Sequence, residues 1–429
     1  MERTVAQQKF NVQDCHVVGF DVSAKTLNWY TEEPGADGRI LERQSRIVNR
    51  TGAIGELLQG LSELADRQGK GLLVACEPSG GYERKLMRLA RAKGALTCYV
   101  SGEATHKLTI LESNDTGKND PKDARVIYRI AGLRTALLTD RQTACGYEQL
   151  RELNRFYEDE DEQVVQVRNA ISALRRKLFC DLRAGSDWLF GGTGQAFLAL
   201  YRGNPNRAVS DGWERFQQNL KRCCPRVPAK TLRRLWEDVQ SSACLLQPDA
   251  VMAQWEARLA TLMDDWRRHE LRKADLKATM VSLYERLPEF IRLSGTGVST
   301  FALARIIAET GPLSDYRSWR QLLRLAGLNL NVHQSGAHKG QTRISKKGSA
   351  LLRKVLYQQT FAVLTQGRGL FADYFRKRRQ GDHPVLAKKL YVNVMRKFLR
   401  ALFGAYHDGC FITARVFLDE IHYARHHAA

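Results

Sequence analysis

The sequence lacks both a membrane-spanning segment and a cysteine framework. A membrane helix needs about 18 to 20 consecutive apolar residues, and no run approaches that length. The stretch Met1–Asp14 is polar and contains no apolar signal-peptide core. The nine cysteines are odd in number and form no C-x-x-C pair, so we expect reduced and mostly buried thiols. We therefore expect a cytoplasmic protein without a membrane partner.

Acidic residues are also few compared with basic ones. The chain has 67 Lys and Arg against 46 Asp and Glu, a net charge of +21, which favours a polyanionic partner. From Ala337 to Ala405 there are 16 basic residues and only two acids. A basic run can be a solvated face, but one this long and one-sided indicates a phosphate-contacting surface. Its predicted nucleic-acid contacts are Lys339, Arg343, Lys346, Lys347 and Arg353.

The 429 residues, 43% of them apolar, suffice for three folded parts, which we place at 1–140, 141–286 and 287–429. The first part has an α/β pattern. Its expected strands and helices are, in order, strands His16–Phe20, Leu27–Tyr30 and Ile40–Val48, helix Ile54–Leu64, strand Gly71–Cys76, helix Tyr82–Ala92, strand Leu96–Val100 and a helix starting near Asp120. This order is that of the ribonuclease-H-like (RuvC-like) fold.

The second part is predicted to be a helical coiled-coil arm. Apolar residues follow heptad spacing from Leu150 to Leu178 and again from Met252 to Leu283. Two such helices favour an antiparallel arm or a dimerisation element. The insert between them, Gly185–Gln247, is basic in places and shows no clear periodicity.

The third part is predicted to be mostly helical. Its segment LSGTGVSTFALARIIAETG has the pattern helix, Gly-x-Gly turn, helix, which is typical of a helix-hairpin-helix-like element. Such a hairpin presents backbone N–H groups at a helix N-terminus, where a phosphate can bind. A Gly-x-Gly sequence on its own is equally typical of an ordinary tight turn.

Four carboxylates of the first part lie at strand ends or at a helix start. Asp21 and Glu77 end two expected strands, and Asp120 and Asp123 lie three apart at a helix start. In the ribonuclease-H-like layout the first and fourth strands are adjacent and the last helix packs on them, so the four would converge. Converging carboxylates repel unless a cation neutralises them, and oxygen ligands suit Mg²⁺ or Mn²⁺. Each also has a simpler role, as a turn residue, a solvated strand end or a helix cap.

A serine in the third part is the second candidate. Ser335 lies in the sequence Gln-Ser-Gly before the basic stretch, and a glycine after a serine lets a phosphate approach closely. A serine nucleophile needs activation and nearby cations to attack a phosphodiester. Composition and spacing alone do not separate this role from an ordinary Ser-Gly turn.

Six segments, taken in order, resemble the DEDD transposases of bacterial insertion sequences, a family also called bridge recombinases. They span about 15–135 and 287–360, with mild departures at Asn119 and at Ser294–Gly297. The segments are GFDVSAKTL, ACEPSGGYERKLMRLARAKG, KNDPKDARVI, LSGTGVSTFALARIIAETG, LLRLAGLNLNVHQSG and RISKKGSALLRKVL.

The resemblance implies an activity. Asp21, Glu77, Asp120 and Asp123 fall on the family's DEDD positions, and Ser335 falls on its serine nucleophile. The family joins target and donor DNA under a structured non-coding guide RNA, called the bridge RNA. Its active site is composite, with the acidic domain and the serine domain supplied by different subunits of a tetramer. We therefore expect RNA-guided DNA transposition through a covalent phosphoserine, by a dimer that assembles to a tetramer at the nucleoid.

Two other functions are compatible with the same residues. A metal-dependent nuclease resembling a junction resolvase would use the carboxylates and leave Ser335 incidental. A non-catalytic RNA-binding scaffold would use the carboxylates only as caps. Cleavage by a Ser335→Ala variant separates the first from a serine recombinase, and metal-independent RNA binding without strand transfer would indicate the second.

Overall fold

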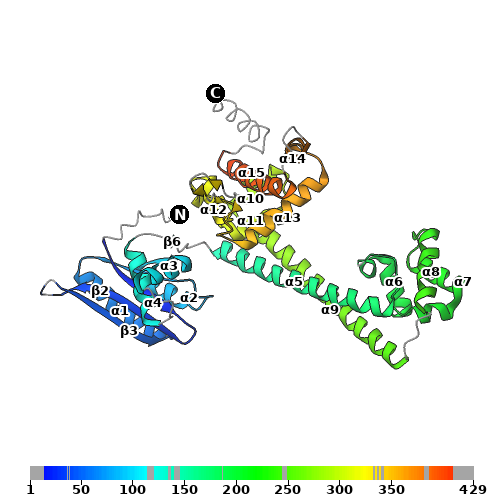
Figure 1. Ribbon diagram of the computed structural model, residues 1–429, viewed down its shortest axis with the longest axis horizontal. Coiled ribbons are helices and arrows are strands. Elements are labelled where there is room, and N and C mark those ends of the chain that lie inside the picture. The colour runs from blue at the N-terminus through cyan, green and yellow to red at the C-terminus, as the bar shows by residue number, and fades with distance from the viewer. Residues whose placement is uncertain are drawn as a thin grey trace. The chain divides into compact units, whose positions relative to one another are not determined.

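The computed structural model describes most of the chain, in two compact units, Met1–Gln142 and Thr143–Ala429 (Figure 1). The described residues are 14–35, 37, 39–113, 120–133, 137–139, 145–185, 187–243, 249–331, 334–335, 338–339, 343–380 and 386–408. Only the backbone is described at 112–113, 120–122, 137–139, 249, 331, 334–335 and 338–339. The first unit is a mixed α/β sheet and the second is mostly helical.

The first unit is built on a six-stranded sheet with the order β3-β2-β1-β4-β5-β6. The strands are β1 Cys15–Val22, β2 Thr26–Pro34, β3 Ile40–Val48, β4 Gly71–Cys76, β5 Leu96–Val100 and β6 Leu137–Thr139. Strands β1 to β3 pair antiparallel through short connections, whereas β1, β4 and β5 are parallel. Parallel neighbours require long crossovers, and helices supply them here.

Helices cover both faces of this sheet. They are α1 Thr51–Arg67, α2 Arg84–Ala92, α3 Gly102–Ser113 and α4 Asp120–Gly132. Val18 and Phe20 of β1 pack with α1 and α2, and Val17 packs with α4 on the opposite face. Since both faces are buried, β1 and β4 have continuous apolar runs rather than alternating ones.

The five strands and three helices predicted for this unit are present in the predicted order, and the first and fourth strands are neighbours. The structure adds two elements that the sequence did not predict, helix α3 and the short strand β6. The observed order of elements is therefore the predicted one, with α3 and β6 added after β5.

The second unit is organised around two long helices, α5 Cys145–Leu178 and α9 Asp249–Tyr284. They pack antiparallel, because Tyr147 clusters with Tyr284 at one end and Ile171 clusters with Leu259 at the other. Predicted heptad residues of α5, such as Leu150 and Leu178, are buried in the clusters that α5 shares with α9. The prediction of two long helices is confirmed, and they form an antiparallel pair within one chain (Figure 1).

The insert between the two long helices is a small helical bundle with its own core. It contains the 3-10 turn η2 Trp188–Phe190 and helices α6 Gly192–Tyr201, α7 Pro205–Cys223 and α8 Ala229–Ala243. Phe197, Phe216 and Leu232 are fully buried in this core. Helix α7 is broken at Gly212, whose φ is 73°.

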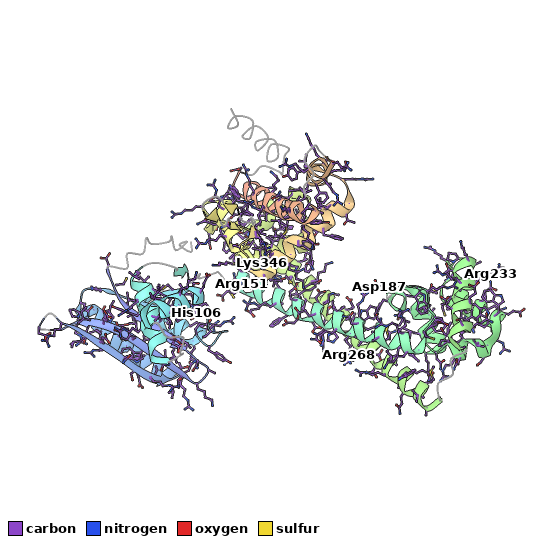
Figure 2. The ribbon with its side chains drawn as sticks, viewed as in Figure 1. His106, Arg151, Asp187, Arg233, Arg268 and Lys346 are labelled. Atoms are coloured by element: carbon purple, nitrogen blue, oxygen red, sulfur yellow. The ribbon has the colours of Figure 1, made fainter. Side chains whose placement is uncertain are left out.

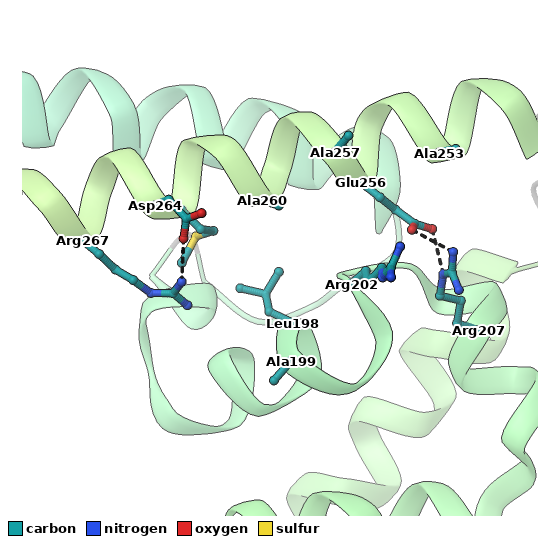
Figure 3. A pocket seen from close by; sticks show the side chains of 11 residues that line it. Leu198, Ala199, Arg202, Arg207, Ala253, Glu256, Ala257, Ala260, Asp264 and Arg267 are labelled. Carbon is teal, nitrogen blue, oxygen red and sulfur yellow. Dashed lines mark hydrogen bonds and ion pairs between the residues drawn. The ribbon is translucent and has the colours of Figure 1, made fainter.

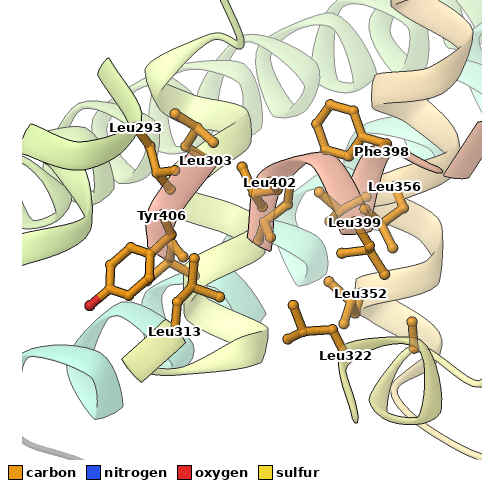
Figure 4. Packing of buried hydrophobic residues seen from close by; sticks show 14 of the residues in the cluster. Leu293, Leu303, Leu313, Leu322, Leu352, Leu356, Phe398, Leu399, Leu402 and Tyr406 are labelled. Carbon is orange, nitrogen blue, oxygen red and sulfur yellow. The ribbon is translucent and has the colours of Figure 1, made fainter. Parts of the chain in front are cut away.

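At the other end of the α5–α9 pair lies the C-terminal helical bundle. Its helices are α10 Pro288–Leu293, η3 Ser294–Thr296, α11 Thr300–Thr310, η4 Leu313–Asp315, α12 Trp319–Leu325, α13 Ala350–Gln366, α14 Leu370–Gln380 and α15 Ala387–Asp408. Leu303 of α11, Leu352 of α13 and Leu402 of α15 meet in its core (Figure 4). Within the described part of the chain, none of the helices is long and apolar enough to span a membrane.

Candidate active site

The strand register places Asp21 beside Glu77. Strands β1 and β4 are parallel, and Phe20 is paired with Cys76. The next residue on each strand is Asp21 on β1 and Glu77 just beyond β4, so the two carboxylates follow side by side at the carboxyl end of the sheet. Adjacent positions of a parallel pair share a face, and both side chains therefore lie on the same side of the sheet.

That side is the one covered by α4. Gly19 lies against the helix, since a Cβ added there would be 2.3 Å from the Ala124 carbonyl oxygen and 2.5 Å from the Tyr128 amide nitrogen. Residues two apart on a strand share a face, so Asp21 is on the α4 side as well. Asp123 is in the first turn of α4, one residue before Ala124. The close approach that only glycine allows thus brings the start of α4 to the strand that carries Asp21.

Asp21 is half-buried and has a neighbour that orients it. Asn28 is its partner across the β1–β2 pair, and the Asn28 amide donates a hydrogen bond of 3.4 Å to the Asp21 carboxylate. A carboxylate only accepts hydrogen bonds, and an amide N–H is a suitable donor to it. The contact fixes the side chain toward β2 without neutralising its charge.

Glu77 is positioned by a glycine of another element. A Cβ added to Gly102, the first residue of α3, would lie 2.2 Å from the Glu77 Oε1 atom. The carboxylate therefore occupies the space that any larger residue at position 102 would fill. This contact could not be predicted from the sequence, because α3 itself was not predicted.

The loop after Glu77 is organised by a second glutamate, Glu83, which sequence reasoning missed. Its buried carboxylate accepts hydrogen bonds from the Ser79 amide at 3.1 Å, the Ser79 hydroxyl at 2.9 Å and the Gly81 amide at 2.9 Å. Burial alone would raise the pKa of Glu83, but the hydrogen bonds from its own backbone, Ser79 and Gly81 outweigh burial and lower it. An ionised Glu83 thus closes the loop that follows the candidate ligand.

The fourth predicted carboxylate, Asp120, is the first residue of α4, and its side chain lies outside the described residues. Among the side chains that are described, no three His, Cys, Asp or Glu residues are close enough together to hold a metal ion. The structure therefore places Asp21, Glu77 and Asp123 on one face at one edge of the sheet, but it does not gather these three into an ion-binding group.

The chemistry of this donor set fits a hard divalent cation. Asp21 and Glu77 are adjacent carboxylates of like charge, and carboxylate oxygens are the ligands that Mg²⁺ and Mn²⁺ prefer. The Asn28 amide and the glycine contact at Gly102 hold the two side chains at the strand ends.

Ser335 lies on a short β-ladder between α12 and α13. It is the last residue of β8 Gln334–Ser335 and pairs with His338, the first residue of β9 His338–Lys339. The side chains of Ser335 and Lys339 are outside the described residues. Flanking the ladder, β7 Leu330–Asn331 pairs with β10 Arg343–Ile344. The serine is thus carried on paired strands.

Two glycines allow the backbone stretches before and after this ladder to pack closely together, next to α12 and α13. Gly327, with φ 64°, and Gly348, with φ 152°, lie against each other's segments, and a Cβ on Gly348 would be 2.2 Å from the Leu325 carbonyl oxygen. The Lys346 amide donates to the Gly327 carbonyl at 2.9 Å, and the Ser349 amide donates to the Leu325 carbonyl at 2.7 Å. The segment that carries Ser335 therefore starts and ends at two backbone stretches that are hydrogen-bonded to each other.

The predicted basic contacts divide into two groups. Arg343, Lys346 and Lys347 are exposed beside the serine ladder, and Figure 2 labels Lys346. Arg353 instead donates through Nη1 to the Ala326 carbonyl at 2.8 Å and to the Ser349 carbonyl at 3.4 Å. Its guanidinium thus helps to hold together the two backbone stretches between which the ladder lies.

A buried polar network connects α11 and the start of α13 to α5. Arg305 of α11 forms an ion pair with Glu158 of α5, which also pairs with Lys354 of α13. Arg305 donates to Asn154 at 3.0 Å, and Ser349 at the start of α13 donates to Glu309 at 2.7 Å. Arg305 and Glu158 are 6% and 8% exposed, so each charge depends on its partner. Sequence reasoning missed this network, because its members lie on three separate helices.

The predicted hairpin is present as α10, a turn and α11. Gly297 has a φ of 73° in the turn, and the Ser299 hydroxyl caps α11 by accepting from the Ala302 amide at 3.3 Å. Two helices joined by a turn at the Gly-x-Gly sequence are therefore present, as the pattern predicts. Because α11 is largely buried, its visible role is to anchor the bundle.

A cavity of about 470 Å³ lies in the second unit between the insert and α9 (Figure 3). Two of its three arginines are paired with carboxylates. Arg207 donates two hydrogen bonds of 3.0 Å to Glu256, and Arg267 pairs with Asp264 at 2.9 Å. The cavity includes none of the predicted site residues.

The described site comprises carboxylates at strand ends in the first unit and a serine on a basic helical bundle in the second, a combination compatible with nucleic-acid processing. Comparison with known families agrees. A transposase profile for DEDD proteins of the IS110 type matches residues 18–179, and a profile described as Transposase IS116/IS110/IS902 family matches residues 293–376. The matches together cover more than half of the chain, which belongs to the IS110 family of transposases. No curated protein matches the chain.

Proposed function

We propose that the chain is an RNA-guided DNA recombinase that moves an insertion sequence through a covalent serine–DNA intermediate. Family membership makes it a DNA transposition enzyme. The observation that carries the finer proposal is the β1–β4 register, which sets Asp21 beside Glu77 on the face that the start of α4 covers. The sheet order β3-β2-β1-β4-β5 supports a ribonuclease-H-like, RuvC-like first domain.

In the proposed reaction the Ser335 hydroxyl oxygen attacks a DNA phosphorus. A phosphoserine ester forms, one phosphodiester P–O bond breaks, and the released deoxyribose oxygen takes a proton while the serine proton passes to a base. Joining is the reverse, with the hydroxyl of the other DNA end attacking the ester and Ser335 leaving. Each step exchanges one ester for another, so no external energy source is needed.

Four residues would hold the metal ions in this proposal, namely Asp21, Glu77, Asp120 and Asp123. A bound Mg²⁺ or Mn²⁺ supplies charge neutralisation at the phosphate and at the leaving oxygen. The chain's own groups orient the site, because Asn28 holds Asp21 and the Gly102 contact holds Glu77. The exposed Arg343, Lys346 and Lys347 would bind the DNA backbone near the serine.

The proposal includes partners that the family implies. A structured non-coding guide RNA would select target and donor DNA by base pairing, while the protein holds backbones, and the net charge of +21 suits a complex of both. We also propose a dimer that assembles to a tetramer at the nucleoid. Exposed apolar residues on the arm, Phe156 and Val165 of α5 and Leu271 of α9, support a contact between subunits.

A metal-dependent nuclease is the alternative, favoured by the register that sets Asp21 beside Glu77, because a carboxylate pair with bound metal can cut DNA without a serine. The test compares Ser335→Ala with Asp21→Asn on DNA carrying the element's own ends and the RNA that flanks it. The recombinase proposal expects both variants to leave every strand uncut. Cutting by Ser335→Ala but not by Asp21→Asn would replace it with the nuclease.

A further inference from the structure

The insert on the arm carries a surface of basic side chains that the proposed reaction does not use. From Arg215 to Trp236 the chain has seven basic residues and no acidic one, and all seven are exposed. They lie on the second half of α7, on the following turn and on the first half of α8, and Figure 2 labels Arg233. The seven, named here the insert basic surface, are Arg215, Lys221, Arg222, Arg226, Lys230, Arg233 and Arg234.

Some cations of the arm are paired with carboxylates, whereas those of the insert basic surface are not. Elsewhere on the arm, Arg168 pairs with Asp187 at 2.6 Å and Lys273 pairs with Asp161 at 2.8 Å. No side chain of the insert basic surface pairs with a carboxylate of the described residues. Unpaired like charges on one surface repel, so this arrangement favours an anionic partner.

The surface is also held rigidly. The buried Asp238, one turn after Arg234 on α8, accepts a hydrogen bond of 3.1 Å from the Arg183 amide and pairs with the Arg183 guanidinium. Ser242 accepts from the Asp181 amide at 3.0 Å. Helix α8 is therefore fixed to the end of α5, and its exposed cations are held in place rather than on a mobile loop.

The chemistry of the surface distinguishes among polyanions. Binding of single strands relies on exposed aromatic side chains that stack on bases. Of the aromatic residues nearest the cations, Phe216 is buried in the core of the insert, and the half-buried Trp213 and Trp236 pack against it and against each other. In the described part of the insert, the only large apolar residue that is well exposed is Val209. The surface offers phosphate contacts without a stacking platform, which suits a duplex.

We propose that the insert basic surface binds the phosphate backbone of duplex DNA at a distance from the serine ladder. The insert contacts the α5–α9 pair near Ile171 and Leu259, whereas the serine-bearing bundle contacts it near Tyr147 and Tyr284. Lys230 and Arg234 are four residues apart on α8, a rise of about 6 Å, which spans roughly two phosphates along one strand. The insert would thus add a second, sequence-independent DNA contact, an inference that rests on DNA as the family's substrate and not on the serine chemistry.

The test is the triple variant Lys230→Ala, Arg233→Ala and Arg234→Ala in the full chain. Binding to a 30-base-pair DNA lacking the element's sequence is followed by fluorescence anisotropy over a range of salt concentrations. Loss of three phosphate contacts makes the slope of log affinity against log salt shallower by about 2.7, or 0.9 for each contact. The same three-charge loss is made in a control variant, Lys107→Ala, Arg155→Ala and Arg268→Ala, whose cations already pair with carboxylates.

The proposal expects a shallower slope in the insert variant and an unchanged slope in the control, with circular dichroism showing equal helix content in both. Equal slopes in the two variants would overturn it, as would a loss confined to single-stranded DNA or to duplex RNA. The Ser335→Ala protein is expected to bind the duplex as the wild type does, so failure of the serine mechanism and failure of this inference are told apart.

Discussion

The contact between Glu77 and Gly102 gives the sharpest test of the carboxylate site. In a Gly102→Ala variant the new methyl carbon would start 2.2 Å from the Glu77 Oε1 atom. Restoring ordinary van der Waals contact requires the carboxylate to move by about 1 Å, and a misplacement of about 1 Å at a catalytic site typically costs about 10²-fold in rate. The backbone is not strained, because position 102 begins a helix and alanine is a better helix former than glycine.

The variant is therefore expected to lose about 100-fold in strand exchange while its melting temperature stays level or rises slightly. Strand exchange is measured on DNA with the element's ends, and Mn²⁺ affinity is measured by calorimetry on the same protein. Gly60→Ala in α1 is the matched control, because nothing lies within 4 Å of its added methyl group. Wild-type rates and Mn²⁺ affinity in the Gly102→Ala protein would refute the role given to Glu77.

Three further outcomes concern stability. Glu158→Ala should lower the free energy of unfolding by about 3 to 5 kcal/mol, because it leaves the buried Arg305 unpaired. Gly348→Ala should cost about 1 to 3 kcal/mol, since its φ is 152° and the facing atom is backbone. Glu83→Gln should lower the melting temperature most at neutral pH, because the pKa of Glu83 is lower in the fold than in the unfolded chain. The contribution of the ionised carboxylate to stability is fully present above the unfolded-state pKa of about 4.3, and it is lost as the pH falls through the lower pKa of the folded state.

Denaturant unfolding and thermal melts measure all three. Glu162→Ala, an exposed neighbour on α5, is the control for Glu158 and should change stability by less than about 0.5 kcal/mol. An equal loss in both glutamate variants would contradict the importance of the buried network. A Gly348→Ala protein as stable as the wild type would contradict the interlocked glycines, and a Glu83→Gln effect that grows on acidification would contradict the pKa direction.

Most of the first unit could be predicted from the sequence because its strands are buried on both faces and its helices have regular apolar spacing. The missed helix α3 lacks these signals. Thr105 and Thr109 are poor helix formers, and Ile110 and Leu111 are exposed rather than buried. Periodicity therefore identified the elements that pack their apolar residues and missed the one that packs only part of them.

The insert could not be assigned for a different reason. Helix α7 is broken at Gly212, so its apolar residues change phase halfway and no single helical period fits the segment. Its core depends on aromatic residues distant in the chain, such as Phe197 and Trp236. Charge, by contrast, was visible in the sequence, and the structure adds that the seven cations from Arg215 to Arg234 are all exposed.

The carboxylate positions of the candidate site could be predicted from local sequence patterns, but the support of the serine could not. Asp21 and Glu77 were placed correctly as strand-end neighbours, because the strand order dictates their register. The support of the serine could not be foreseen, since it depends on Gly327 and Gly348 meeting across 21 positions of the chain and on Arg305 bridging three helices. Such long-range pairing leaves no periodic signal in the sequence.

The measurement that tests the central claim most directly is the search for a protein–DNA adduct on Ser335. The full chain is mixed with Mg²⁺, the flanking RNA and DNA whose ends cannot be rejoined, and the denatured product is digested and analysed by mass spectrometry. The proposal predicts a nucleotide linked to the peptide that contains Ser335, and its absence in the Ser335→Ala variant. Cleaved DNA without any adduct, or an adduct on another residue, would contradict it.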